Sequence, residues 1–296
     1  MNTTEKYIDE NRKVFSLKNK LVRNHTSTPK AITGGSLFNI LKYHFKSCVR
    51  FILYFPLVLY KGKNFLGKTF SIKGTKKKNK ALIIGNGPSQ GYLSCSELDN
   101  FVESGGETFA INSWHQNEEL SKHIPTWMVF SDPLTFNYSE PGAKGIINYI
   151  KKNPKIKILV PSSDIKLIQS LGFENEIFCF IDLELSIWKN INPLLPRGYT
   201  STTIYKALAW SIYLDYNIIG VIGMDNTLPR NIYNDKENKV HFYRHYAGKE
   251  DCLVDASKYH LNVASFYYDV FEIFYHLEYF PNKNIRNLDP FSLTDR

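Results

Sequence analysis

The chain contains 296 residues, of which 43% are hydrophobic and 22% are charged, as in ordinary globular proteins. This length and composition exclude collagen-like, coiled-coil and intrinsically disordered chains, and allow one larger α/β domain with or without an appendage. The four cysteines are far apart and form no C-x-x-C pair, so the sequence predicts neither a zinc knuckle nor a disulfide framework.

Positive charge is concentrated near the N-terminus. Residues 1–80 contain 18 Lys and Arg against three acidic side chains, whereas residues 81–296 contain 19 against 25. A protein that follows nucleic-acid phosphates spreads basic residues over its folded surface, so we expect no nucleic-acid partner. The division predicts a basic, aromatic-rich appendage over residues 1–79 and a main domain over residues 80–296.

The appendage combines apolar and cationic side chains. Residues 36–60 alternate apolar and aromatic residues with Lys42, Lys46 and Arg50, and a lysine tract follows at 76–78. This composition suits a helix that lies on an anionic membrane surface, and a helical hairpin packed on the main domain is the alternative. Within residues 36–60 the longest uncharged stretch, residues 51–60, contains Pro56 and is far shorter than the roughly 20 residues of a membrane-spanning helix.

From residue 81 onward, short apolar runs alternate with helical patterns, which indicates strands joined by crossover helices. The pattern predicts helices at 200–216 and 251–279, and a polar, aromatic stretch at 226–248 that suits a lid. The predicted fold class is α/β: a single Rossmann-like domain with a mostly parallel sheet, a lid segment and a basic N-terminal helical appendage. Strands are expected at 81–85, 108–112, 127–130, 157–160, 176–181, 218–223 and 284–288.

A glycine loop follows the first predicted strand and precedes a predicted helix. It consists of Gly85, Asn86, Gly87, Pro88 and Ser89. Its glycines allow close approach of a ligand, and the N–H groups of a following helix can bind a phosphate. The loop lacks the lysine of a Walker motif and the third glycine of a dinucleotide fingerprint, so it predicts a nucleotide site of another kind.

Polar residues also follow other predicted strands, at the edge where open α/β sheets bind ligands. Capping of loops is the alternative role for each of them. No second carboxylate lies within two residues of Asp132, so the sequence predicts no divalent-metal site there. The candidate binding residues are Asn112 and Ser113 after the second strand, Asp132 after the third, Arg197, Thr200 and Ser201 before the helix at 200–216, and Asp225 after the sixth strand.

The predicted lid contains the candidate catalytic residues Tyr243, Arg244, His245 and Tyr246, together with His241. A histidine can take a proton from a sugar hydroxyl, and tyrosine or arginine can stabilise a departing phosphate. The two histidines could instead bind zinc, but neither the glutamate of H-E-x-x-H nor an obvious third ligand accompanies them. We therefore favour acid–base chemistry over a metal site.

Taken together, six motifs resemble the bacterial sialyltransferases of glycosyltransferase family 42, over roughly residues 80–293. These are GNGPS, the Asn of FAINSW, an Arg followed by Thr-Ser before a helix, G-x-D after the next strand, H-x-x-x-H, and a terminal N-L-x-P-x-S-L. The resemblance implies a CMP-activated sialic acid donor, inversion at the anomeric carbon and no metal. It also implies that Asn86 and Asn112 hold CMP, that Thr200 and Ser201 lie near the donor, and that His245 is the general base.

The chain departs from the family pattern at positions around the donor. The family has Asn where this chain has Asp132, Gly where it has Thr202, and Tyr where it has Phe242. A related CMP-linked ulosonic acid therefore also fits. We expect transfer to a cell-surface glycan or glycolipid at the inner face of the bacterial cytoplasmic membrane, with no cofactor, and leave a homo-oligomer open. The alternatives are a Mg-ATP-dependent pyrophosphokinase that shares the G-x-G-P-S loop, and a non-catalytic nucleotide-binding assembly protein.

Overall fold

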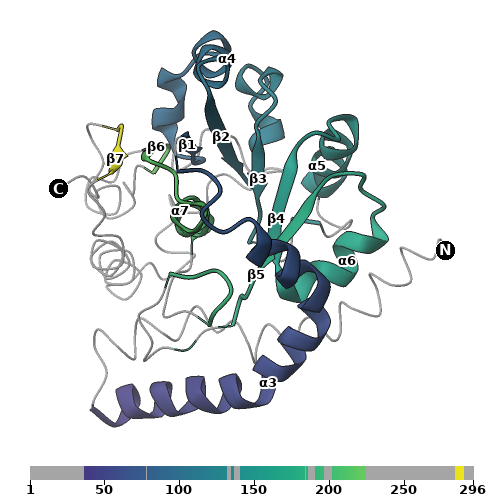
Figure 1. The fold of residues 1–296 in the computed structure, drawn as a ribbon, viewed down its shortest axis with the longest axis vertical. Helices are drawn as coiled ribbons and strands as arrows, with labels where there is room; N and C mark the ends of the chain where they lie inside the picture. The colour runs from purple at the N-terminus through teal and green to yellow at the C-terminus, as the bar shows by residue number, and fades with distance from the viewer. Residues whose placement is uncertain are drawn as a thin grey trace, which may run out of the picture.

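The computed structural model of the chain describes residues 37–77, 79–131, 135–136, 141–183, 185, 191–196, 202–224 and 284–289. They form a seven-stranded, entirely parallel sheet in the order β5-β4-β3-β2-β1-β6-β7, flanked by helices (Figure 1). The predicted α/β class, with a single Rossmann-like domain, is confirmed. The strands are β1 (Lys80–Ile84), β2 (Gly106–Ile111), β3 (Trp127–Val129), β4 (Lys157–Pro161), β5 (Ile177–Phe180), β6 (Ile218–Ile222) and β7 (Ile285–Asn287).

All seven strands lie within or overlap the predicted segments, because central strands of a parallel sheet are covered on both faces and therefore read as continuous apolar runs. In β1, Ala81 and Ile83 pack into one hydrophobic cluster, whereas Leu82 and Ile84 pack into the other. The described helices are α3 (Leu37–Ser71), α4 (Cys95–Glu103), α5 (Pro141–Lys152), α6 (Ile165–Ser170) and α7 (Thr203–Leu214). The first four contribute to the cluster on one face of the sheet, and α7 contributes to the cluster on the other.

The appendage is one continuous helix over residues 37–71, so the hairpin is wrong for this part of the chain. The packing on the main domain that the same alternative predicted is confirmed for the C-terminal half of the helix. The helix bends along its length in Figure 1, and it contains Pro56, whose missing N–H and bulky ring are a common cause of such a bend. Within the described residues, no helix is long and apolar enough to cross a membrane.

The C-terminal part of α3 covers the outer edge of the sheet at β5. The Thr69 hydroxyl donates to the Cys179 carbonyl at 3.0 Å and accepts from the Cys179 N–H at 3.3 Å. The Tyr213 hydroxyl of α7 donates to the Thr69 carbonyl at 3.2 Å. This bond joins α3 to the helix that covers the other face of the sheet. An edge strand exposes unpaired backbone groups, and Thr69 satisfies two of them here.

The segment between α3 and β1 is held by a half-buried carboxylate, Glu107. It accepts hydrogen bonds from Tyr216 at 2.6 Å and from the Trp127 ring N–H at 2.9 Å, and it forms an ion pair with Lys76. Burial alone would raise the pKa of Glu107, but the hydrogen bonds from Lys76, Tyr216 and Trp127 outweigh it and hold the pKa below its usual value. One lysine of the basic tract is therefore engaged by the main domain.

Candidate functional site: a nucleotide crevice

The strand order indicates where a ligand is expected to bind, beyond the ends of two neighbouring strands. β1 pairs with β2 on one side and with β6 on the other, so the direction of winding reverses between β1 and β6. In open parallel sheets, ligands bind beyond the carboxyl ends of the strands at this point of reversal. The glycine loop follows β1, and Gly223 and Met224, the described part of the G-x-D segment, follow β6, so both lie at the carboxyl ends of their strands.

The loops after β1 and β6 touch through their backbones. The Gly87 N–H donates to the Gly223 carbonyl at 2.9 Å, and the Gly223 N–H donates to the Ser89 hydroxyl at 2.9 Å. A Cβ atom on Gly85 would lie 2.3 Å from the Gly223 oxygen, and Gly223 itself has φ +75. Both positions therefore require glycine, one for close packing and the other for its left-handed backbone.

The glycine loop does not open an α-helix, so that prediction is wrong in detail. A 3₁₀ turn, Pro88–Tyr92, follows the loop, and α4 begins only at Cys95 with a capping box between Ser94 and Glu97. The turn is fixed by Gln90, whose side chain donates to the Gly85 carbonyl at 3.2 Å and accepts from Asn117 at 3.0 Å. The first N–H groups of α4 are therefore displaced from the loop.

Asn86 lies at the centre of this loop, between the two glycines. Asn86 is buried, with 8% of its surface exposed. An amide offers both a donor and an acceptor, which suits phosphate or ribose oxygens. We therefore retain Asn86 as a candidate for nucleotide contact.

Asn86→Ala should weaken CMP binding and leave the fold intact. A net hydrogen bond is worth about 0.5–1.5 kcal/mol, or about 1.5–3 to a charged group, so the expected loss is several-fold to about a hundredfold. Calorimetric titration with CMP measures the affinity, and thermal unfolding checks the fold. Unchanged affinity in a folded variant would remove Asn86 from the site.

Asn112, at the carboxyl end of β2, has an unusual backbone and an unsatisfied side chain. Its φ of 41° is in the left-handed region, which Asn tolerates better than most residues. Its amide nitrogen donates to the Thr203 hydroxyl at 3.0 Å, and Thr203 lies 2.5 Å from the Ser131 hydroxyl. Among the described residues, its buried Oδ1 has no hydrogen-bond partner. A buried orphan acceptor is costly, and a ligand that donates a hydrogen bond would satisfy it.

The N-terminus of α7 completes the described part of the site. Thr202 is its N-cap residue, and Thr203 connects it to the strand ends of β2 and β3. Ile204 lies against Gly85, with its Cδ1 2.7 Å from a Cβ built there. Thr203 was not among the binding residues predicted from the sequence, although consecutive threonines at a helix start were a usable indication.

Two neighbours of Asn112 have local roles. Ser113 precedes the 3₁₀ turn Trp114–Gln116, and its carbonyl accepts from the Gln116 N–H at 2.9 Å. His115 packs against Gly145 of α5, and burial lowers its pKa to about 4. His115 is therefore neutral at physiological pH.

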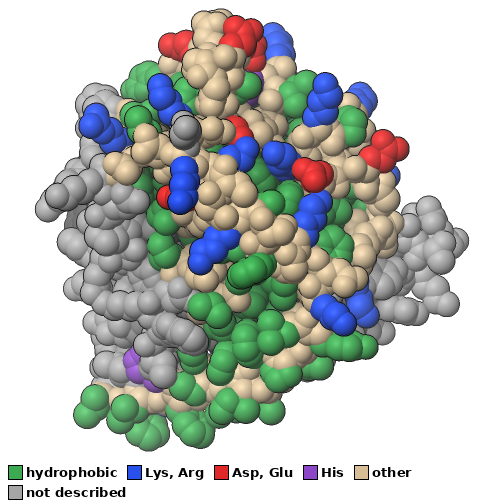
Figure 2. All heavy atoms as spheres, viewed as in Figure 1, with side chains coloured by type: hydrophobic (Ala, Val, Ile, Leu, Met, Phe, Trp, Pro, Cys, Tyr) green, Lys and Arg blue, Asp and Glu red, His purple; other side chains and the backbone are tan. Residues whose placement is uncertain are grey.

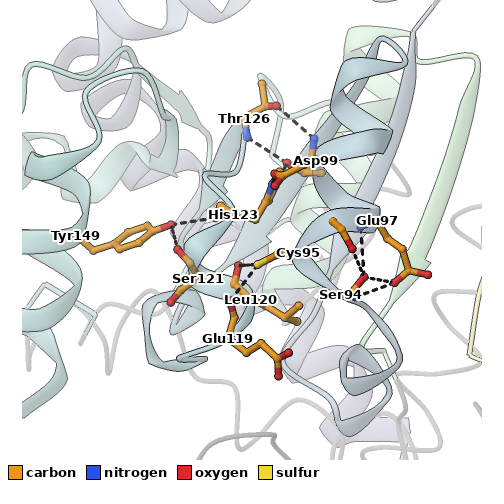
Figure 3. A network of polar contacts seen from close by, with 12 residues as sticks. Ser94, Cys95, Glu97, Asp99, Glu119, Leu120, Ser121, His123, Thr126 and Tyr149 are labelled. Carbon is orange, nitrogen blue, oxygen red and sulfur yellow. Dashed lines mark hydrogen bonds and ion pairs between the residues drawn. The ribbon is translucent and has the colours of Figure 1, made fainter.

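A second polar network, part of which is drawn in Figure 3, links an aspartate, a histidine and a hydroxyl as a hydrolase triad does, but its hydroxyl belongs to Thr108 inside β2 and not to a strand end. His123 Nδ1 is 2.6 Å from the Asp99 carboxylate, and His123 Nε2 is 2.9 Å from the Thr108 hydroxyl. Thr108 has no exposed surface, so a substrate cannot reach its hydroxyl, which also accepts from the Thr126 N–H at 3.3 Å. This network joins α4, β2 and the segment before β3, and we assign it a structural role.

Several candidates lie outside the described residues. Those of the strand ends and helix start are Asp132, Arg197, Thr200, Ser201 and Asp225, and those of the lid at 226–248 are Tyr243, Arg244, His245 and Tyr246. The helix expected at 251–279 lies outside them too. Within the part of the chain that the structure describes, no group of three or more His, Cys, Asp or Glu could hold a metal ion.

The fold defines the class of the protein as a Rossmann-like α/β domain whose direction of winding reverses between β1 and β6. Comparison of the sequence with protein-family models and with curated proteins finds no match.

Proposed function

We propose that the protein is an inverting, metal-independent glycosyltransferase. It moves sialic acid or a related ulosonic acid from a CMP-activated donor to a cell-surface glycan or glycolipid. The proposal of a nucleotide site rests on the buried Oδ1 of Asn112 at the end of β2, next to β1, which has no hydrogen-bond partner among the described residues. The six sequence motifs that resemble the sialyltransferases support the choice of donor.

The described residues around the end of β1 and the start of α7 suit a nucleoside monophosphate. The loop of Gly85 to Ser89 and the N-terminus of α7 lie beside one another, since Ile204 contacts Gly85. Backbone N–H groups at a helix start favour a phosphate, so the α7 end suits the charged part of CMP. Asn112 Oδ1 can accept from the amino group of cytosine or from a ribose hydroxyl.

In the proposed reaction, His245 removes the proton from the acceptor hydroxyl. The acceptor oxygen forms a bond to the anomeric carbon while the bond from that carbon to the CMP phosphate breaks, and CMP departs with the electron pair. Tyr243, Arg244 and Tyr246 stabilise the phosphate as its charge develops. We place this reaction on lipid-linked acceptors at the inner face of the bacterial cytoplasmic membrane.

Calorimetric titration of the wild-type protein with CMP, CDP, UDP and ATP, with and without Mg²⁺, tests the donor class. We expect CMP to bind without Mg²⁺. Binding of Mg-ATP alone would contradict the proposal and favour the pyrophosphokinase. Binding of CMP with no transfer from any CMP-sugar would favour a non-catalytic protein.

Asn112→Ala should lower CMP affinity by several-fold to about a hundredfold, because it removes the acceptor at the end of β2. The matched control is Asn100→Ala on the exposed side of α4, which should bind CMP like the wild type. If both variants bind CMP equally well, Asn112 does not contact the nucleotide.

A further inference from the structure

The outer side of α3 carries an exposed apolar stripe, defined by Phe38, Leu41, Phe45, Val49 and Ile52. These side chains recur every three or four residues, so they lie along one side of the helix. Their exposed fractions are 69, 58, 70, 37 and 68%, respectively. Figure 2 shows hydrophobic side chains gathered along the end of the molecule where the N-terminal half of α3 lies in Figure 1. Contiguous exposed apolar surface of this kind marks an interaction site.

The stripe is not the side of α3 that packs on the sheet. Phe51, Phe55 and Val58 pack against the main hydrophobic cluster, and Leu66 belongs to it. These residues also recur at helical spacing, on a different side of the helix from the stripe. The apolar character of the stripe is therefore not explained by the core of the protein.

Cations flank the stripe along one side. Lys42, Lys46 and Arg50 each follow a stripe residue by one position and recur every four residues, so they form a row beside it. Lys42 and Lys46 are exposed, and the Lys42 ammonium lies 6.0 Å from the centre of the Phe38 ring. Over its whole length α3 contains six Lys and Arg and neither Asp nor Glu.

We propose that α3 binds an anionic membrane surface through this stripe. The helix would lie in the plane of the interface, with the apolar side chains at the acyl boundary and the row of cations at the lipid phosphates. The 14 residue steps from Phe38 to Ile52 span about 21 Å, at ~1.5 Å per residue. A second copy of the chain is a poorer occupant, since two such faces would bring like-charged rows together. This inference depends on α3 alone and does not require the proposed transferase activity.

Co-sedimentation of the full chain with vesicles tests it. The vesicles contain equal parts of phosphatidylcholine and phosphatidylglycerol, or phosphatidylcholine alone. We expect the wild type to bind the anionic vesicles more tightly. Lys42→Gln/Lys46→Gln/Arg50→Gln should weaken that binding about a hundredfold, since each cation near the surface contributes roughly fivefold. Phe45→Ser/Ile52→Ser should weaken binding to both kinds of vesicle by at least about tenfold.

Matched control variants test whether the effect belongs to the stripe and its row of cations, or to any loss of positive charge or apolar surface. Lys151→Gln/Lys152→Gln/Lys155→Gln removes three exposed cations elsewhere, and Ile124→Ser removes an exposed apolar side chain that is 52% exposed. Both controls should bind vesicles like the wild type. Failure of the wild type to bind anionic vesicles at low salt would overturn the proposal. So would a concentration-dependent dimer that Phe45→Ser/Ile52→Ser abolishes, because it would assign the stripe to a second copy.

Discussion

His245→Ala should lower kcat for sugar transfer by about 10²–10⁴-fold, the usual effect of losing a general base. Donor binding should survive, because the proposed nucleotide contacts lie on the strand ends and on α7 rather than on the lid. Steady-state kinetics with a CMP-sugar, together with calorimetric titration of CMP, measure the two effects separately. A variant that retains CMP affinity and loses turnover is the expected result.

His241→Ala is the matched control, since both histidines belong to the same H-x-x-x-H motif. It should retain most of the activity. If His241→Ala causes the larger loss in kcat while His245→Ala behaves like the wild type, the roles assigned to His245, Tyr243 and Tyr246 are wrong together. The nucleotide site at the strand ends would be unaffected by that outcome.

Gly85→Ala should lower both the stability of the protein and its affinity for CMP. The new Cβ would lie 2.3 Å from the Gly223 oxygen and 2.8 Å from the Gly223 carbonyl carbon. Because these are backbone atoms, no side-chain rotation can relieve the overlap, and the loops after β1 and β6 must separate. Overpacking of this kind typically costs about 1–3 kcal/mol. Urea unfolding measures the stability, and calorimetric titration measures the affinity.

Gly91→Ala provides the control within the same segment. A Cβ at Gly91 meets no atom within 4 Å, so the free energy of unfolding should stay within about 0.5 kcal/mol of the wild type. Equal stability of the two variants would mean that the contact between Gly85 and Gly223 is not maintained in solution.

The strands were predictable from sequence because a strand that is buried on both faces consists of consecutive apolar residues, as in β1 and β4. The 3₁₀ turn after the glycine loop was not, because it depends on Gln90 bonding to Gly85 and Asn117, a contact across segments that no local periodicity encodes. Local patterns describe a helix or a strand, whereas tertiary hydrogen bonds decide how a loop ends.

The residues of the candidate site also differ in how far their positions could be predicted from the sequence. Asn86 and Asn112 were predictable because each follows a recognisable strand, and the topology then brings strand ends together. The contact between Thr203 and Ser131 was not predictable, since it requires the start of α7 to lie on the ends of β2 and β3. The lid residues and the sugar donor stay predictions from sequence.

The pairing of Thr69 with Cys179 bears on how the chain can be divided. The charge distribution separates residues 1–79 from the rest, but the hydroxyl that closes the edge of β5 comes from the basic side of that boundary. A chain shortened to residues 80–296 would leave this strand as a free template for pairing with other molecules. If such a fragment aggregated, the cause would therefore be the uncovered edge of the sheet and not the loss of a membrane-binding helix. The distribution of charge alone is a poor guide to where this chain can be truncated.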